Sequence, residues 1–511
     1  MAVLSIDAGT TGITAVVVDV AGQVVAQGYC EFEQHFVQPG WVEHNPEQIW
    51  QATLQAVGQA LGEFAGQTMV NDLGGPRICA IGITNQRETV VLWRRSDLVA
   101  PRAAIVWQDR RTSTIVDELR SQTTVSGEPV EKLVRRITGL GLDPYFSSTK
   151  LMWITRNEPE IWSQVLAGEV AVGTVDSYLI ARLTGGTVHV TDASNASRTQ
   201  MLDIASGGWS PELLELFGVP EFALPKVVAS SGVVGRVSAD ELPALAGVPI
   251  SGIAGDQQAA LFGHAAFTPG DTKCTYGTGA FILQNTGKTA VASEHGLLTT
   301  IAWMLPSAVA DEGPQITYAL EGSVFVAGAA VQWLRDGLEI IQSAAELNPL
   351  AEAAGDNGGV TFVPALTGLG APHWQPDARG TLFGLTRGTS RGNIAQATLE
   401  AIAFQVRQVF DLFGSEAGLA CSRLVVDGGA SANNRLMQLQ ADCIGTKVAR
   451  NQTSQVTALG AAYLAGLGAG VWSSLAEISA LVQSEREFTP AAFDQSLYAR
   501  WCRAVELTKQ F

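Results

Sequence analysis

Two segments rich in glycine and threonine have the composition of a phosphate-binding turn. They are residues 7–12, with the sequence DAGTTG, and residues 277–279, with the sequence GTG. Glycine lets several backbone N–H groups point at one cluster of oxygens, and threonine hydroxyls add further donors. One isolated copy is better explained as an ordinary hairpin turn. Two copies in corresponding places, one early in each half of the chain, favour phosphate binding.

Two carboxylates, Asp7 and Asp256, stand out as candidates for chemistry beside these glycine turns. Asp7 ends the strand-like residues 3–6, where it would either hold Mg²⁺, directly or through water, or cap the turn. Asp256 stands where a helix N-cap belongs, and such a cap contributes about 1 kcal/mol. In the alternative, Asp256 is a general base that accepts a hydroxyl proton during group transfer. Without further context, capping is the simpler explanation of Asp256.

A third group of residues has the chemistry needed to bind a small polyol. The adjacent Arg87 and Glu88 would donate to and accept from hydroxyl groups, while Trp107, Tyr145 and Phe281 would form an apolar wall against the C–H face. Nothing local in the sequence brings these residues together. The alternative is an exposed Arg–Glu pair and three aromatic residues of the core.

The elements around these residues predict an α/β fold. In the first half, the apolar segments 14–19, 80–84 and 103–107 indicate strands, and the last two end in polar residues, as at an α/β binding site. A helical period of apolar residues lies between them, at Ile49, Leu54, Val57 and Leu61.

The second half repeats this pattern. Strands are expected at 272–276, 280–283 and 424–426, the last ending at Asp427. One helix is expected from the apolar period at Val324, Ala327, Val331, Leu334 and Leu338, and another over 456–467, where alanine and glycine allow close backbone packing. The glycines and proline of residues 245–255 mark the best candidate for a domain boundary. We therefore expect a duplicated architecture of two domains, residues 1–252 and 253–511.

Composition narrows the classes of protein and partner. The chain has 511 residues, of which 46% are apolar and 16% charged, so a large core is feasible. Lys and Arg number 32 against 49 Asp and Glu, giving 32 − 49 = −17, which disfavours nucleic acid as a partner. Six cysteines without a Cys-x-x-Cys pair predict reduced thiols. The N-terminal residues lack a secretory pattern and no apolar run reaches about 18 residues, so we expect a cytoplasmic protein without membrane insertion.

Blocks of sequence over nearly the whole chain resemble the FGGY family of carbohydrate kinases, and within it the members that act on glycerol. They are residues 7–11, 39–46, 82–89, 105–111, 142–147, 173–176, 191–192 with 195–199, 255–258, 275–279, 318–322, 427–430 and 456–460. The resemblance implies two actin-like ATPase (ribonuclease H-like) domains with ATP and glycerol in the cleft between them. It also implies a homo-oligomer, either a dimer or a tetramer.

The resemblance assigns roles to matching positions. Glycerol would be bound by Arg87, Glu88, Trp107, Tyr145, Asp256, Gln257 and Phe281, with Asp256 as the catalytic base. The nucleotide would be bound by Thr10, Thr11, Gly277, Thr278, Gly328, Gln332, Gly429 and Asn433, and Asp7 would hold Mg²⁺ through water. The implied reaction is an in-line attack of a primary hydroxyl on the γ-phosphorus of ATP, giving sn-glycerol 3-phosphate and ADP.

Three departures from the family pattern bear on regulation and on ATP binding. Bacterial members usually have Ser-Ser-Arg where this chain has residues 12–14, Gly-Ile-Thr, so one cationic phosphate contact is missing. We expect either weaker ATP binding or a substitute cation. Residues 243–249 replace the loop that binds a sugar bisphosphate inhibitor, and no regulatory histidine lies near residues 230–231. We expect neither form of regulation here.

Two alternatives stay open from the sequence. One is a kinase for another short polyol or a ketose, because the fold and the ATP site are shared across the family and pocket shape decides the substrate. The other is a non-catalytic, nucleotide-gated sensor on the same fold, against which the presence of Asp256 argues.

Overall fold

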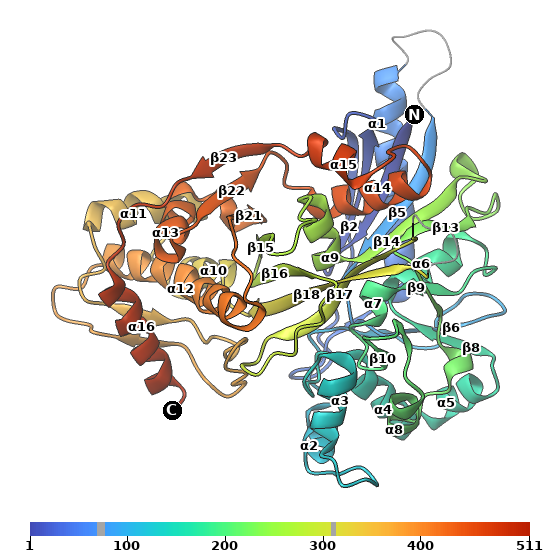
Figure 1. The fold of residues 1–511 in the computed structure, drawn as a ribbon, viewed down its shortest axis with the longest axis horizontal. Helices are drawn as coiled ribbons and strands as arrows, with labels where there is room; N and C mark the ends of the chain where they lie inside the picture. Colours follow the sequence, from blue (N-terminus) through green and yellow to red (C-terminus); the bar gives the residue numbers. More distant parts are fainter. Residues whose placement is uncertain (69–76, 308–312, 511) are drawn as a thin grey trace.

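Two large β-sheets with helices around them make up the protein (Figure 1). The computed structural model describes residues 1–68, 77–307 and 313–510. The first sheet has the strand order β13 (Ser231–Arg236), β14 (Pro249–Gly255), β5 (Ile78–Asn85), β1 (Ala2–Ala8), β2 (Gly12–Asp19) and β3 (Val24–Glu31). The second has the order β17 (Leu298–Leu305), β18 (Gln315–Val324), β16 (Ala280–Gly287), β15 (Thr272–Tyr276), β21 (Arg423–Asp427), β22 (Lys447–Asn451) and β23 (Ser484–Phe488).

The helices and the shorter strands surround these sheets. The helices are α1 (Pro46–Thr68), α2 (Ser113–Arg120), α3 (Val130–Thr138), α4 (Ser147–Asn157), α5 (Pro159–Leu166), α6 (Val175–Leu183), α7 (Ala193–Ala196), α8 (Pro211–Phe217), α9 (Asp256–Gly263), α10 (Gly328–Asp336), α11 (Leu347–Ala354), α12 (Arg391–Ala417), α13 (Asn434–Ile444), α14 (Val456–Gly468), α15 (Leu475–Leu481) and α16 (Gln495–Thr508). The two-stranded pairs are β4 (Glu43–His44) with β7 (Ala104–Ile105), β6 (Val91–Arg94) with β8 (Val170–Gly173), β9 (Val190–Asp192) with β12 (Lys226–Val228), β10 (Leu202–Asp203) with β11 (Gly208–Trp209), and β19 (Thr361–Val363) with β20 (Thr381–Phe383).

The two glycine turns occupy equivalent places in the two sheets. In the first, β1 and β2 form an antiparallel hairpin, and β1 also pairs in parallel with β5. In the second, β15 and β16 form the hairpin and β15 pairs in parallel with β21. The first turn therefore lies at the same edge of its sheet as the carboxyl end of β5, and the second lies at the same edge as the carboxyl end of β21. This repeat is the duplicated architecture that the sequence predicts.

Helix α14 comes from the second half of the chain but packs on the first sheet, against β5, β14 and β1 (Figure 1). The predicted alanine- and glycine-rich helix is confirmed, and glycine makes its close packing feasible. A Cβ on Gly82 would lie 2.2 Å from the carbonyl oxygen of Ala461, and a Cβ on Gly460 would lie 1.8 Å from that of Ala259 in α9. The first sheet is covered on its other side by α1, which packs on β2 and β3.

Most predicted elements are confirmed, and two predictions are wrong in extent. Val324 belongs to β18, and α10 begins only at Gly328, because the chain turns between them. Of the predicted strand 103–107, only Ala104–Ile105 pairs, with β4. Residue 252, after which the sequence analysis divides the chain, lies inside β14, and that division stays a prediction.

Two further features concern the chain as a whole. All six cysteines lie in the described parts of the chain and are free. Within residues 1–68, 77–307 and 313–510, no helix combines the length and apolar character that crossing a membrane requires.

Candidate active site between the two sheets

Arg87 and Glu88 follow β5 and point into the interior. Their exposed fractions are 2% and 1%, so the alternative of an exposed Arg–Glu pair is wrong. Glu88 has φ 63°, a left-handed conformation that is uncommon for residues other than glycine. Strain of this kind persists only where the surroundings determine the backbone, and it is frequent at functional sites.

The guanidinium of Arg87 gathers residues from distant parts of the chain. Nη1 and Nη2 donate to the two carboxylate oxygens of Glu321 on β18, at 2.6 and 2.9 Å. Nη1 also lies 3.2 Å from Oε1 of Gln258, and Nη2 lies 3.4 Å from the hydroxyl of Tyr145. Nε lies 3.1 Å from Oδ1 of Asp256. All three nitrogens of the guanidinium therefore have a partner.

Asp256 is the first residue of α9 and keeps 31% of its side chain exposed. Gly255 occupies the N-cap position, so the simpler explanation of Asp256 as a helix cap is wrong. Oδ1 of Asp256 accepts a hydrogen bond from the backbone N–H of Gln257 at 2.7 Å. Oδ1 is thus held by Arg87 and the backbone while the side chain remains open to solvent, as a base that meets a substrate must be.

Gln257 is fixed by a buried lysine. Nζ of Lys273, on β15, donates to Oε1 of Gln257 and to the hydroxyl of Thr275, the latter at 2.9 Å. The pKa of Lys273 is lowered, because the effect of burial is larger than the opposing effect of negative charges such as those of Asp427 and Asp256. The amide of Gln257 is thereby oriented, with Nε2 3.4 Å from Oδ2 of Asp256.

The three aromatic residues form one wall beside these polar groups. The rings of Trp107 and Tyr145 meet edge to face with centroids 5.5 Å apart, and those of Trp107 and Phe281 are 6.5 Å apart. Nε1 of Trp107 donates to Oγ1 of Thr10 at 3.0 Å, which joins the wall to the first glycine turn. Phe281 lies at the start of β16, directly after the second turn. The wall therefore spans the space between the two turns.

Asp7 lies near Asp256 at the end of β1. Burial, and then the negative charge of Asp256, raise the pKa of Asp7 to about 7. The part of the chain that the structure describes contains no group of three or more His, Cys, Asp and Glu residues placed to hold a metal. One or two carboxylates suffice for Mg²⁺, however, when phosphate oxygens and water complete its coordination. Two carboxylates that repel each other beside the first glycine turn fit that requirement.

Thr10 and Thr11 lie in the turn between β1 and β2 of the first sheet, and the other six predicted nucleotide residues belong to loops and helices around the second sheet. The backbone N–H of Gly328 donates to the carbonyl of Gly277 at 3.0 Å, and that of Ala329 donates to the carbonyl of Thr278 at 3.0 Å, so the turn lies against the start of α10. Gly277 and Thr278 are exposed, as is Gln332 on α10. Gly428 has φ 86°, and a Cβ there would lie 2.5 Å from the carbonyl oxygen of Tyr276, so the 427–429 segment packs on the same turn.

Asn433 lies beyond that segment and is the N-cap of α13, because its side chain accepts from the N–H of Leu436 at 3.0 Å. Gly429 is exposed, with open space where a Cβ would point. Gly429 thus follows directly on the residue that packs against Tyr276, and Asn433 ends the short helix 429–432 that comes next.

The sequence analysis did not select three residues of this site, namely Arg198, Lys273 and Glu321. Nε of Arg198 donates to Glu88 at 2.7 Å, and Nη2 of Arg198 lies 3.3 Å from Glu321. Glu321 and Lys273 are charged residues inside strand patterns, and each has an exposed fraction of 0%. A charge at an inward position of a buried strand was the signal that could have identified them.

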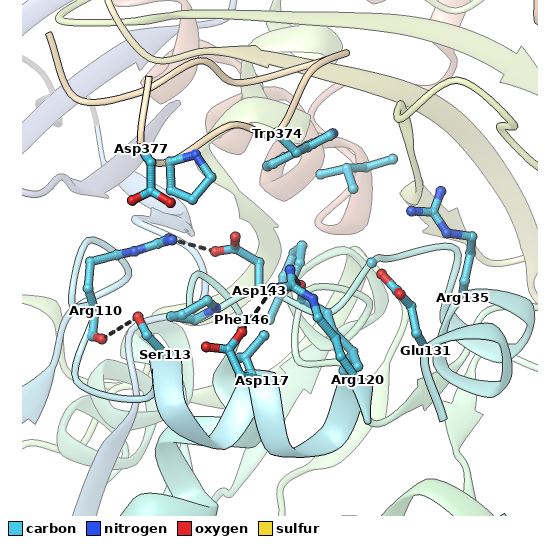
Figure 2. A pocket seen from close by; sticks show the side chains of 16 residues that line it. Arg110, Ser113, Asp117, Arg120, Glu131, Arg135, Asp143, Phe146, Trp374 and Asp377 are labelled. Atoms are coloured by element: carbon cyan, nitrogen blue, oxygen red, sulfur yellow. Dashed lines mark hydrogen bonds and ion pairs between the residues drawn. The ribbon is translucent and has the colours of Figure 1, made fainter. Parts of the chain in front are cut away.

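A cavity of about 430 Å³ lies apart from these residues, between α2 and α3 on one side and the loop of Trp374 and Asp377 on the other (Figure 2). The Arg110–Asp143 ion pair, with a 2.7 Å contact, lies at its edge. Phe146 lines it and is the neighbour of Tyr145. None of the predicted site residues is among those that line it, so it does not define the candidate site.

The two α/β halves, the paired glycine turns and the carboxylate between them define a kinase of the two-domain, actin-like class. The chain belongs to the FGGY family of carbohydrate kinases: the model of the family's N-terminal domain matches residues 2–263, and that of its C-terminal domain matches residues 272–469.

Its relatives cover almost the full length. A protein named glycerol kinase from Dechloromonas aromatica (strain RCB) is 50% identical over 507 residues, covering 99% of this chain and 97% of the relative. One of the same name from Saccharolobus islandicus (strain M.14.25 / Kamchatka #1) is 48% identical, covering 99% and 96%. Plasmodium falciparum glycerol kinase with ADP has a similar structure, with a TM-score of 0.89, 35% identity and coverage of 99% and 98%.

Proposed function

We propose that this protein transfers the γ-phosphoryl group of ATP to glycerol, giving sn-glycerol 3-phosphate and ADP. The observation that carries the proposal is the 3.1 Å contact between Nε of Arg87 and Oδ1 of Asp256, beside the wall of Trp107, Tyr145 and Phe281. A three-carbon polyol needs hydrogen-bonding groups for its hydroxyls and an apolar surface for its carbons, and both are present within one site. Relatives of about 50% identity that carry the name glycerol kinase support the same substrate.

Seven residues bind glycerol in this proposal. The hydroxyl groups are bound by Arg87, Glu88, Tyr145, Asp256 and Gln257, while Trp107 and Phe281 pack on the carbon skeleton. Asp256 accepts the proton of the primary hydroxyl of glycerol. The oxygen of that hydroxyl attacks the γ-phosphorus in line with the bond to the leaving oxygen of ADP. The partly exposed position of Asp256 at the start of α9, with Oδ1 held by Arg87, supports this role.

The phosphates and the nucleotide occupy the second part of the site. Thr10, Thr11, Gly277 and Thr278 surround the phosphates with hydroxyl and backbone donors, which suits a chain whose net charge of −17 offers no general attraction for anions. The remaining nucleotide contacts come from Gly328, Gln332, Gly429 and Asn433. Asp7 would hold Mg²⁺ through water, and the ion would supply positive charge to the phosphates. The contribution of the chain is mostly positioning and electrostatics, because charge spreads over the equatorial oxygens in the transition state.

The test is ADP release from ATP and Mg²⁺ across a panel of short polyols and ketoses, with Asp256→Asn as the control variant. We expect the highest kcat/KM with glycerol and loss of activity in the variant. A higher kcat/KM with another polyol or a ketose would establish the alternative substrate. Binding of glycerol and ATP by calorimetry without ADP release would overturn the enzyme and favour the nucleotide-gated sensor.

Location and assembly form a separate part of the proposal. We infer a cytoplasmic protein that forms dimers or tetramers, by analogy with the family. Light scattering on the purified protein measures the mass of the assembly, and a monomer at micromolar concentration would contradict the second inference.

A further inference from the structure

Four buried charged side chains connect the two halves of the molecule at the proposed glycerol site. Arg87, Glu88 and Arg198 belong to the first half, and Glu321 comes from β18 in the second sheet. None of the four exceeds 2% exposure. Glu321 contacts both arginines, Arg87 at 2.6 Å and Arg198 at 3.3 Å, and Arg198 also contacts Glu88 at 2.7 Å. The formal charges balance. Arg87 and Glu88 are two of the proposed substrate residues, and Arg198 and Glu321 each contact at least one of them.

Glu321 is held in its charged form. Burial opposes ionisation, but Arg198 and Arg87 together hold the pKa of Glu321 low, at about 2. Glu88 differs, because burial outweighs the two arginines and its pKa is raised. Glu321 is therefore the carboxylate that balances the buried cations most strongly.

Glu321 also fixes the direction of the Arg87 guanidinium. Its two oxygens accept one hydrogen bond from each of Nη1 and Nη2, a bidentate arrangement that sets both the position and the plane of the group. Because both terminal nitrogens are engaged on that side, Nε is directed toward Asp256 and the outer N–H of Nη2 toward Tyr145. The two contacts that matter for the polyol site thus depend on a residue of the other half.

We propose that Glu321 is a positioning residue for glycerol, which makes the substrate site complete only when β18 of the second sheet lies against the end of β5. This inference rests on the proposed function. It adds that the affinity for the polyol depends on contact between the two halves of the molecule. Arg198 has the same positioning role, since its guanidinium bridges Glu88 and Glu321 and lies 5.7 Å from the centre of the Tyr145 ring.

The experiment compares Glu321→Gln and Glu321→Asp with the unmodified chain. Glutamine keeps the size but loses the charge and one acceptor, so we expect the KM for glycerol to rise at least tenfold and the KM for ATP to change less than twofold. Aspartate keeps the charge and should restore part of the loss. Calorimetry with glycerol alone, without ATP, should show the same weakening.

Gln284→Met is the matched control, because Gln284 is an equally buried polar residue of the second sheet whose side chain bonds Thr272 at 3.2 Å, outside this network. A purely structural loss lowers the amount of active enzyme and the thermal midpoint without moving the glycerol KM. Glycerol KM and affinity like those of the unmodified chain in a folded Glu321→Gln variant would overturn the proposal.

A second variant addresses failure to fold. Glu321→Leu combined with Arg198→Leu removes one charge of each sign, so the buried site stays balanced with Arg87 and Glu88. We expect the same selective rise in glycerol KM, and an unchanged KM would contradict the proposal. Failure of the proposed function is distinguishable, because the unmodified chain itself would then release no ADP with glycerol.

Discussion

The Nε atom of Arg87 lies 3.1 Å from Oδ1 of Asp256, so the end of β5 and the start of α9 meet in one ion pair. The sequence analysis places both residues at a shared substrate, and the structure brings their side chains into contact. In this pair Asp256 keeps 31% of its side chain exposed. The first prediction follows from this geometry.

Arg87→Lys should lower kcat/KM for glycerol about 100-fold, because an ammonium group is a point donor that cannot bond Glu321 in bidentate fashion and also reach Asp256 and Tyr145. Steady-state kinetics with varied glycerol measure the change. Arg95→Lys is the control, since Arg95 bonds His189 and the carbonyl of Phe222 far from this site. A loss of less than threefold in Arg87→Lys would contradict the importance of the forked guanidinium.

Asp7 provides a prediction about pH. Its pKa is about 7 in the folded chain and 3.8 ordinarily, so between these values the unfolded state releases a proton that the folded state retains. The stability linked to Asp7 is therefore fully present below about pH 4 and is lost as the pH rises to about 7. Asp7→Asn stays neutral, so its thermal midpoint should exceed that of the unmodified chain by at least about 2 °C at pH 8 and by little at pH 4.5.

Thermal unfolding without ligands measures this difference, and Asp240→Asn, at an exposed carboxylate, is the control. Mg²⁺ with ATP should then raise the thermal midpoint of the unmodified chain more than that of Asp7→Asn. An Asp7→Asn variant that is less stable than the unmodified chain at pH 8, or that gains as much from Mg²⁺ and ATP, would contradict the prediction.

Thr14 stands where the resemblance described in the sequence analysis leads us to expect an arginine. It pairs with Asp7 across the β1–β2 hairpin and is half-buried, so an arginine there would extend from the strand next to the first turn. Thr14→Arg should lower the KM for ATP about threefold to tenfold by adding a charged donor for phosphate. Thr14→Gln, which is neutral, separates charge from side-chain length. Unchanged KM for ATP and unchanged kcat in Thr14→Arg would show that the missing arginine has been replaced elsewhere.

Trp107 links the aromatic wall to the first glycine turn through its 3.0 Å hydrogen bond to Thr10. Trp107→Phe keeps an aromatic face but removes the indole N–H, so we expect the KM values for glycerol and ATP to rise together, each about threefold to tenfold. Phe281→Leu is the comparison, because it weakens the wall without touching Thr10, and its effect should fall on glycerol alone. If only the KM for glycerol changed in both variants, the prediction would be contradicted, because the hydrogen bond to Thr10 would then have no effect on ATP binding.

The strands and turns that carry the site were predictable because their signals are local. Runs of β-branched or apolar residues beside glycine mark the strands β1, β2, β5, β15 and β16. Two pairs of these strands are hairpins of neighbouring segments, β1 with β2 and β15 with β16, and the second hairpin repeats the pattern of the first. The extent of α10 was not predictable, since the apolar spacing from Val324 onward suits a strand that turns into a helix as well as one helix. Glu321 and Arg198 were not predictable as a pair, because nothing local shows that two distant charges will balance in one interior.

Lys150 supports the proposed substrate site from beneath the loop that carries Tyr145. Its buried Nζ donates to the carbonyls of Pro144, Tyr145 and Phe146 at 2.7, 2.7 and 2.9 Å, and burial lowers its pKa to about 7. Lys150→Met removes three donors at once, and a carbonyl left buried without a partner costs about 1–3 kcal/mol. We therefore expect a lower thermal midpoint together with a rise of about fivefold or more in the KM for glycerol.

Lys150→Arg, which keeps donors on a long side chain, should restore part of the glycerol KM, and Lys132→Met on the outer side of α3 should change neither quantity. The loop orients the Tyr145 hydroxyl, which lies 3.4 Å from Arg87, so a loosened loop weakens the polyol contact before it affects ATP. A Lys150→Met variant with a lower thermal midpoint but an unchanged glycerol KM would show that the loop keeps its place without those three hydrogen bonds, and that the contacts of Tyr145 with Trp107, Arg87 and Arg198 are enough to hold it.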